Sequence, residues 1–270
     1  MKDLAHSSLR SGLLAGLVAA TLAIPGAAAA ASTDPAPLPA AGDGWRLGVA
    51  EVPAPHAAGA KVRTTARIEV LAGQLGQGGA PLQAVAAAQA AQQLADGALD
   101  AWVGVWPDED ASPEGVRATR LAWSAAPMAI MRTDTDIHAW SDLSGRTVCL
   151  SADGRVSGEL SARFGAIEQI YASAADALLA LRVGQCDAAV QDEDFMKQLL
   201  TFPEWRKFSA QLAPYRTQAL TRLMRDDLSA PRKAAVRQAT SAERVRELAR
   251  QQARDIAFEV YLDQTVPDCH

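Results

Sequence analysis

The stretches WSDLSGRTVCLSADGR (residues 140–155) and LRVGQCDAAVQD (residues 181–192) decide the fold of this chain. In the first, a short apolar strand at 148–150 runs into a polar turn that contains Gly154. In the second, a helix predicted over 174–183 ends at Gly184, and a short strand follows that stops on Asp192. This order predicts a βαβ-type unit with polar groups at the carboxyl ends of its strands, where open α/β sheets bind small ligands. The two stretches therefore indicate a protein that binds a small molecule.

The alternation of strands and helices continues along the chain and predicts an α/β fold. A break near the middle of the chain indicates two lobes, and we expect a mostly parallel sheet with flanking helices in each lobe. The first lobe is predicted to comprise residues 44–135 and 217–270, and the second residues 136–216. Hinges are expected near residues 133–137 and 214–218.

The N-terminus predicts export. Lys2 and Arg10 precede an uncharged apolar run at 11–24, and small residues follow at 27–31. This order is typical of a secretory signal peptide, predicted over residues 1–31, and it places the mature protein in the periplasm. The alternative is an uncleaved anchor helix, although the apolar run is shorter than the roughly 20 residues of a typical span. Residues 32–43 are rich in Pro and Ala and predict a flexible lead-in.

Composition narrows the class of partner. The net charge of -5 provides no basic stripe, so nucleic-acid binding is not expected. Neither a metal nor a cofactor is predicted, because the four histidines are scattered and no CxxC motif is present. An oxidising compartment makes one disulfide plausible among Cys149, Cys186 and Cys269, and the sequence leaves all three pairings open.

Residues 140–192 resemble the second lobe of the type II periplasmic solute-binding proteins, specifically the family 3, amino-acid-type receptors of ABC importers. The family pattern W-x-D-L-x-G-K-x-V, followed by a Gly-Thr turn and later by A-L-x-x-G-x-V-D-A-x-V-x-D, is matched in spacing and order. The first lobe matches more loosely, through QLADGALDA (residues 93–101) and RATRLAWSAAP (residues 117–127). The resemblance covers most of residues 44–225, and it implies the two-lobed α/β fold of the type II periplasmic binding proteins.

The resemblance implies a ligand site. The Arg of the first-lobe motif grips the ligand carboxylate, a role that falls to Arg117, with Ser124 in the same motif. A guanidinium suits that role because it forks onto a carboxylate through two hydrogen bonds. The alternative for Arg117 is a surface charge after an acidic loop.

The family's Gly-Thr turn offers backbone N–H groups at a helix N-terminus to the same carboxylate. Gly154 matches the Gly, Arg155 stands in place of the Thr, and Ser157 follows two residues later. A helix N-terminus favours an anion. Arg155 either adds a second cationic contact or faces solvent.

The family's Asp at the end of the second strand receives the ligand's α-amino group, a role that falls to Asp192. The alternative is that Asp192 caps the helix predicted over 193–200, since Asp is a favoured N-cap residue. The chain lacks the family's aromatic wall in its first loop. Trp102 and Trp106 are expected either to replace that wall or to lie in the core.

Three functions follow as hypotheses. The leading one is a periplasmic protein that captures a small zwitterionic or anionic solute for the permease of an ABC importer. An accessory or sensory protein that keeps the fold and binds another exported protein is the second. The third, a periplasmic dehydratase-type enzyme, is disfavoured because no nucleophile–base motif is visible in the sequence.

Overall fold

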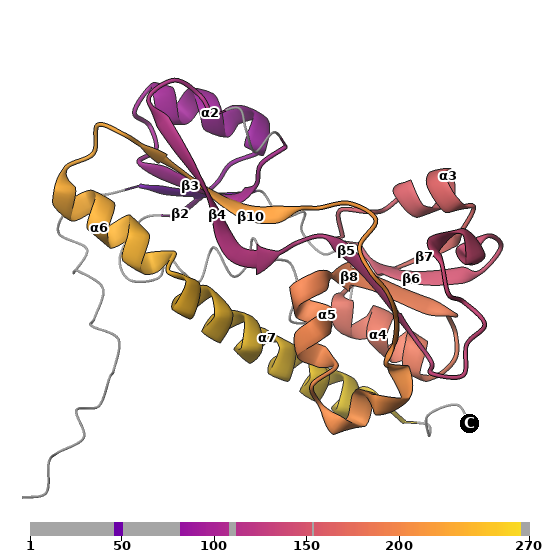
Figure 1. Ribbon diagram of the computed structural model, residues 1–270. Coiled ribbons are helices and arrows are strands. Elements are labelled where there is room, and N and C mark those ends of the chain that lie inside the picture. The colour runs from indigo at the N-terminus through magenta and orange to yellow at the C-terminus, as the bar shows by residue number, and fades with distance from the viewer. Residues whose placement is uncertain (1–45, 51–81, 108–111, 153, 266–270) are drawn as a thin grey trace, which may run out of the picture. The chain divides into compact units, whose positions relative to one another are not determined.

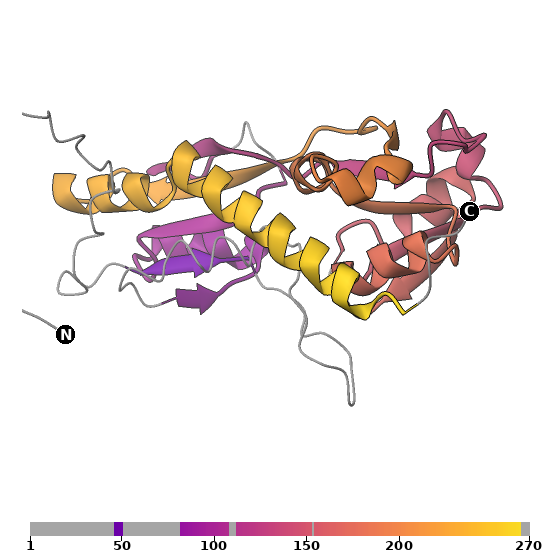
Figure 2. The same cartoon turned by 90° about the horizontal axis from the view of Figure 1, so that it is seen from below.

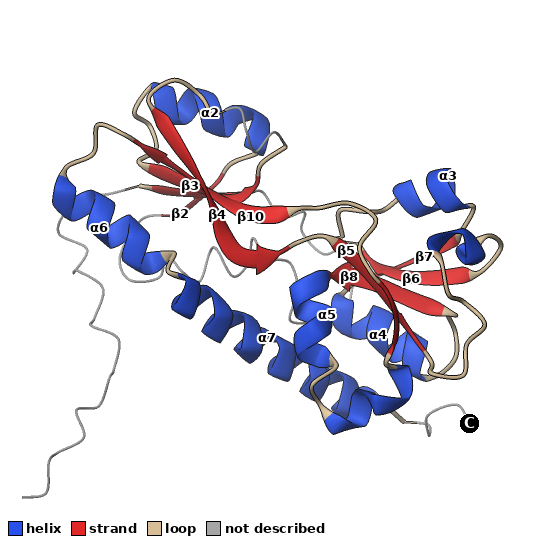
Figure 3. Cartoon of the chain, in the orientation of Figure 1, coloured by secondary structure: helices blue, strands red, loops and turns tan. Residues whose placement is uncertain are grey.

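The computed structural model describes residues 46–50, 82–107, 112–152 and 154–265. These residues form two five-stranded sheets with flanking helices (Figures 1 and 3), which confirms the α/β class with two lobes. Each sheet is mixed rather than mostly parallel, because two of its four strand pairings are antiparallel. The predicted signal peptide, the predicted lead-in and Cys269 lie outside the described residues.

The first sheet has the strand order β2-β1-β3-β10-β4. Strand β1 is parallel to β2 and β3, whereas β10 is antiparallel to both β3 and β4. Helix α2 lies between β2 and β3 in the sequence, and helix α6 follows β10. Their bounds are β1 (Leu47–Val49), β2 (Leu82–Ala84), α2 (Ala87–Ala95), β3 (Ala101–Val105), β4 (Val116–Ser124), β10 (Ala219–Arg225) and α6 (Ala230–Ala239).

The second sheet has the order β7-β6-β8-β5-β9. Strand β6 is parallel to β7 and β8, and β5 is antiparallel to β8 and β9. Two 3-10 helices, η3 and η4, complete this lobe. The bounds are β5 (Pro127–Met131), η3 (Trp140–Leu143), β6 (Thr147–Ser151), α3 (Glu159–Phe164), β7 (Ile167–Tyr171), α4 (Ala174–Arg182), β8 (Ala188–Asp192), α5 (Glu193–Leu199), η4 (Pro203–Phe208) and β9 (Ala210–Leu212).

Local signals explain the elements around β6 and β8. The side chain of Ser173 accepts a hydrogen bond from the Asp176 amide and so caps the start of α4. The helix ends before Gly184, whose φ of 78° is a left-handed conformation that glycine adopts without strain. Strands β6 and β8 are mostly buried, as expected for short apolar strands covered by helices.

Helix α7 (Ala242–Asp263) is the long C-terminal helix, drawn in yellow in Figure 2. Its buried residues recur every three or four positions, at Val245, Ala249, Ala253, Ile256 and Val260. This spacing forms one apolar face, which packs against β4, α4 and α5. Side chains of that face share one apolar core cluster with residues of both sheets. No helix within the described residues is both long and apolar enough to cross a membrane.

The chain passes from the first sheet to the second between β4 and β5. Strand β4 pairs with β10 in the first sheet, and β5, which follows residues 125–126, pairs with β8 and β9 in the second. The C-terminal segment forms two helices, α6 and α7, because Ser241 caps the second helix by accepting a hydrogen bond from the Arg244 amide.

One disulfide joins Cys149 in β6 to Cys186 in the turn before β8, with the two Cα atoms 5.8 Å apart. Because β6 and β8 are neighbours in the sheet, the two side chains meet although 37 positions separate them. Of the three pairings that the sequence left open, the structure selects this one.

Candidate functional site

The carboxyl ends of β6 and β8 form the topological switch point of the second sheet. Strand β6 leads through α3 to β7 on one side, whereas β8 leads into α5. Figure 3 shows α3 on one face of this sheet and α4 and α5 on the other. Adjacent parallel strands whose connections leave toward opposite faces mark the position where open α/β sheets bind ligands. The candidate site is therefore at residues 151–152, 154–155 and 191–192.

An ion pair occupies this position. The Nη2 atom of Arg155 donates to Oδ1 of Asp192, and the side chains are 17% and 14% exposed. The indole Nε1 of Trp123, at the end of β4, lies 3.5 Å from the other carboxylate oxygen. Two residues that the sequence placed at the ligand thus contact each other, and a residue of the first sheet approaches the same carboxylate.

The turn after β6 positions Arg155. The Gly154 amide donates to the Ser151 carbonyl oxygen at 2.8 Å, which closes the turn. A Cβ atom at Gly154 would lie 2.8 Å from that carbonyl oxygen, closer than real Cβ contacts, so the turn requires glycine. Beneath it, Gln191 Nε2 donates to Ser151 Oγ at 3.1 Å and ties the ends of the two strands together.

Asp192 occupies the N-cap position of α5, but its side chain makes no capping hydrogen bond. The capping hydrogen bond expected from one of the two alternatives is therefore not formed by this side chain. The carboxylate is directed to Arg155 and Trp123 rather than to the amides of its own helix.

The helix N-terminus that follows the Gly154 turn differs from the expectation. The amides of Gly158 and Ser161 donate to the two carboxylate oxygens of Glu168, at 2.6 and 2.8 Å. Ser157 is exposed on the turn before α3. The first-turn amides expected to receive an anion thus already hold a carboxylate of the neighbouring strand β7.

Arg117 does not lie with this pair. It is the second residue of β4, its side chain is 64% exposed, and its Nε donates to Asp226 Oδ1 at 3.1 Å. Trp123, whose indole approaches Asp192, is six residues after Arg117 on the same strand. At the rise per residue of an extended chain, these six residues span about 20 Å. The structure thus places the Arg117 side chain at the opposite end of β4 from Asp192.

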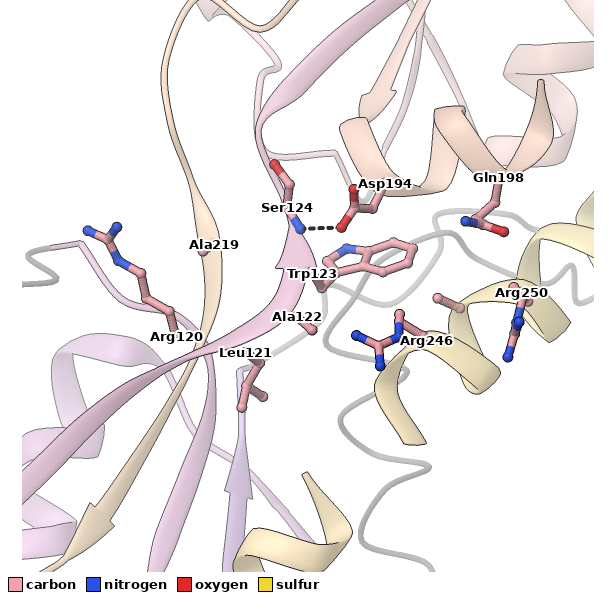
Figure 4. Close-up of a pocket in the computed structure, with 11 residues that line it drawn as sticks. Arg120, Leu121, Ala122, Trp123, Ser124, Asp194, Gln198, Ala219, Arg246 and Arg250 are labelled. Carbon is pink, nitrogen blue, oxygen red and sulfur yellow. Dashed lines mark hydrogen bonds between the residues drawn. The ribbon is translucent and has the colours of Figure 1, made fainter. Parts of the chain in front are cut away.

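Ser124 joins β4 to the start of α5. Its amide donates to Asp194 Oδ2 at 2.7 Å (Figure 4), and its hydroxyl donates to Glu193 Oε2 at 2.6 Å. Burial acts to raise the pKa of Glu193, but hydrogen bonds from Lys197 and Ser124 hold it below its usual range. Burial raises the pKa of Asp194, which the hydrogen bond from Ser124 only partly offsets. Both hydrogen-bond donors of Ser124, the amide and the hydroxyl, thus bond to protein carboxylates.

Two cavities adjoin this junction. One, of about 530 Å³, lies between β4, α5 and α7 (Figure 4), and the other, of about 480 Å³, extends along residues 214–219. Arg120 lines both cavities but was not among the predicted site residues. The sequence feature that could have identified it is its position in the RATRLAWS motif, three residues after Arg117.

The two tryptophans of the first lobe have different surroundings. Trp102 is fully buried and donates from Nε1 to the Val85 carbonyl oxygen at 2.9 Å, which places it in the core. Trp106 is partly buried and meets Trp102 edge to face, with ring centroids 6.0 Å apart. Within the part of the chain that the structure describes, no group of three or more His, Cys, Asp or Glu side chains is placed to hold a metal ion.

Neither a family model nor a curated protein matches the sequence. Solved structures similar to this chain include the GluR0 ligand-binding core in complex with L-glutamate, at 14% identity and a TM-score of 0.47, covering 78% of this chain and 98% of that one. A substrate-binding protein of an amino-acid ABC transporter matches at 17% identity and a TM-score of 0.39, covering 80% and 96%. The periplasmic VFT2 domain of BvgS from Bordetella pertussis matches at 17% identity and a TM-score of 0.39, covering 77% and 92%.

Proposed function

We propose that this protein is an exported, periplasmic solute-binding protein that captures a small zwitterionic or anionic, amino-acid-like solute for the permease of an ABC importer. The observation that carries the proposal is the Arg155–Asp192 pair at the switch point of the second sheet. A guanidinium and a carboxylate at the carboxyl ends of adjacent parallel strands match the place and the chemistry of a site for a charged small molecule.

Partial burial makes the pair suitable for recognition. A charge-assisted hydrogen bond strengthens as water is excluded, and both side chains are mostly buried. When a charged solute binds, contacts between the solute and these two side chains replace the ion pair between Arg155 and Asp192. The proposal assigns a binding role to these residues and no catalytic step.

A second candidate function rests on a different surface. Phe258, Tyr261 and Leu262 are all exposed on α7, at positions i, i+3 and i+4. This spacing places them on one helix face, and exposed apolar patches of this kind mark protein interaction sites. The alternative is therefore an accessory or sensory protein that binds an exported partner through the end of α7.

Thermal unfolding of the protein purified after export tests both functions. The panel comprises amino acids, small dicarboxylates and polyamines. A ligand at 100 times its dissociation constant stabilises the native state by about 2.7 kcal/mol, which raises the melting temperature by roughly 5–10 °C for a chain of this size. Arg155→Gln should abolish the shift, whereas Arg254→Gln, at an exposed position on α7, should keep it. A flat panel together with a specific co-purifying protein would instead favour the accessory function.

A further inference from the structure

We infer that the cavity between β4, α5 and α7 is a second binding site, which takes a small organic anion with an apolar body, such as an aryl-substituted carboxylate. The site is separate from the one proposed above, because neither Arg155 nor Asp192 lines this cavity. Its volume of about 530 Å³ lies within the range of natural ligand pockets. The inference therefore goes beyond the proposed function and does not depend on it.

The walls of the cavity are mostly apolar and are made largely by small side chains. Ala122 on β4, Ala219 on β10 and Ala249 on α7 leave space that longer side chains would fill. Leu121 and the indole of Trp123 complete this apolar part (Figure 4). The Trp123 side chain is only 2% exposed, so the surrounding core holds its ring in place. An aromatic or aliphatic group packs well against such a ring, and the body of the ligand is therefore expected to be apolar.

One arginine of the lining is left without a partner in the described part of the chain. Arg246 is exposed on α7, and its side chain makes no hydrogen bond or ion pair with any residue that the structure describes. Figure 4 shows its guanidinium directed from α7 toward β4, near Ala122, whereas Arg120 is directed away from α7. A guanidinium is always charged and presents N–H donors in a fork that matches a carboxylate. Arg246 therefore supplies the group that selects an anion.

The other charged residues near this wall have protein partners. Arg250, one turn after Arg246 on the same helix, pairs with Glu247, with 2.6 Å between Nη2 and Oε2. Asp194, on α5, accepts a backbone hydrogen bond from β4, and in Figure 4 the Trp123 side chain is drawn between Asp194 and Arg246. The unpaired guanidinium and the carboxylate thus belong to different walls of the cavity. The anionic group of a ligand is expected at the α7 wall, with its apolar body toward the indole.

Three related probes on the unmodified protein test the ligand class. Calorimetric titration should show saturable one-to-one binding of hydrocinnamate, with a dissociation constant of about 1 mM or tighter. Hydrocinnamamide has the same body without the charge, and acetate has the charge without the body. Each should bind at least about fivefold more weakly than hydrocinnamate. Absence of hydrocinnamate binding, or equal binding of either other probe, overturns the inference.

Three variants then locate the site. Arg246→Gln should weaken hydrocinnamate binding at least about fivefold, because it removes a charge-assisted contact. Ala122→Leu, at a partly buried position of β4, should weaken binding at least about tenfold, because the longer side chain occupies the cavity. Arg254→Gln, on the same helix but outside the lining, is the matched control and should leave the affinity unchanged.

The same measurements separate this inference from the proposed function. If hydrocinnamate binding is unchanged in Arg246→Gln but lost in Arg155→Gln, the anion binds at the Arg155–Asp192 pair, which overturns the second site and supports the proposed function. If the wider solute panel gives no hit while hydrocinnamate binds through Arg246, the second site holds and the proposed function fails. The melting temperature of each variant without ligand shows whether it is folded, and Arg246→Gln decides the matter if Ala122→Leu is not.

Discussion

Replacing both Cys149 and Cys186 by alanine should lower the free energy of unfolding by about 4 kcal/mol. The bond closes a loop between positions 37 apart. A cross-link of that span removes about 13 cal/mol/K of entropy from the unfolded chain, or roughly 3.8 kcal/mol at room temperature. For a protein of this size, the melting temperature should fall by roughly 8–15 °C. Cys149 is fully buried, so lost packing adds to the effect.

Urea unfolding followed by tryptophan fluorescence measures this difference. The protein with the disulfide and the variant with alanine at positions 149 and 186 should both carry Cys269→Ala, so that a third thiol cannot exchange with the disulfide. Peptide mapping of the unmodified protein should recover Cys149 and Cys186 in one linked fragment. A difference below about 1 kcal/mol would refute the loop-closure argument, and a linked fragment that contains Cys269 would refute the pairing itself.

Two further predictions concern the junction between β4 and α5. Ser124→Ala removes the hydroxyl bond to Glu193 and should lower the free energy of unfolding by about 1–2 kcal/mol in urea titration. Ser161→Ala, at an exposed hydroxyl bonded to a backbone carbonyl, is the control and should cost less than about 0.5 kcal/mol. Burial raises the pKa of the Asp194 carboxyl, so the charged carboxylate destabilises the folded state at pH values above that pKa. The destabilisation disappears as the pH falls and the carboxyl becomes protonated. Asp194→Asn should therefore stabilise the protein relative to wild type at pH 7 more than at pH 4; the opposite trend would contradict the burial argument.

Much of the second lobe could be predicted because its signals are local. The helix that became α4 has a Ser173 cap at its start and Gly184 at its end, and the strands beside it are short apolar runs. Strand β9 was missed because its three residues carry no strand pattern of their own and form a strand by pairing with β5. The lobe to which β5 belongs likewise depends on its partners, β8 and β9.

The positions of the polar groups after β6 and β8 could be read from the residues alone, because glycine turns and apolar runs act within a few residues. How those groups pair depends on the folded chain. Asp192 meets Arg155 across 37 positions, and Arg117 meets Asp226 across 109, at the other end of β4. Partners so far apart in sequence are set by which strands become neighbours, and strand pairing is a property of the whole fold that no local motif contains.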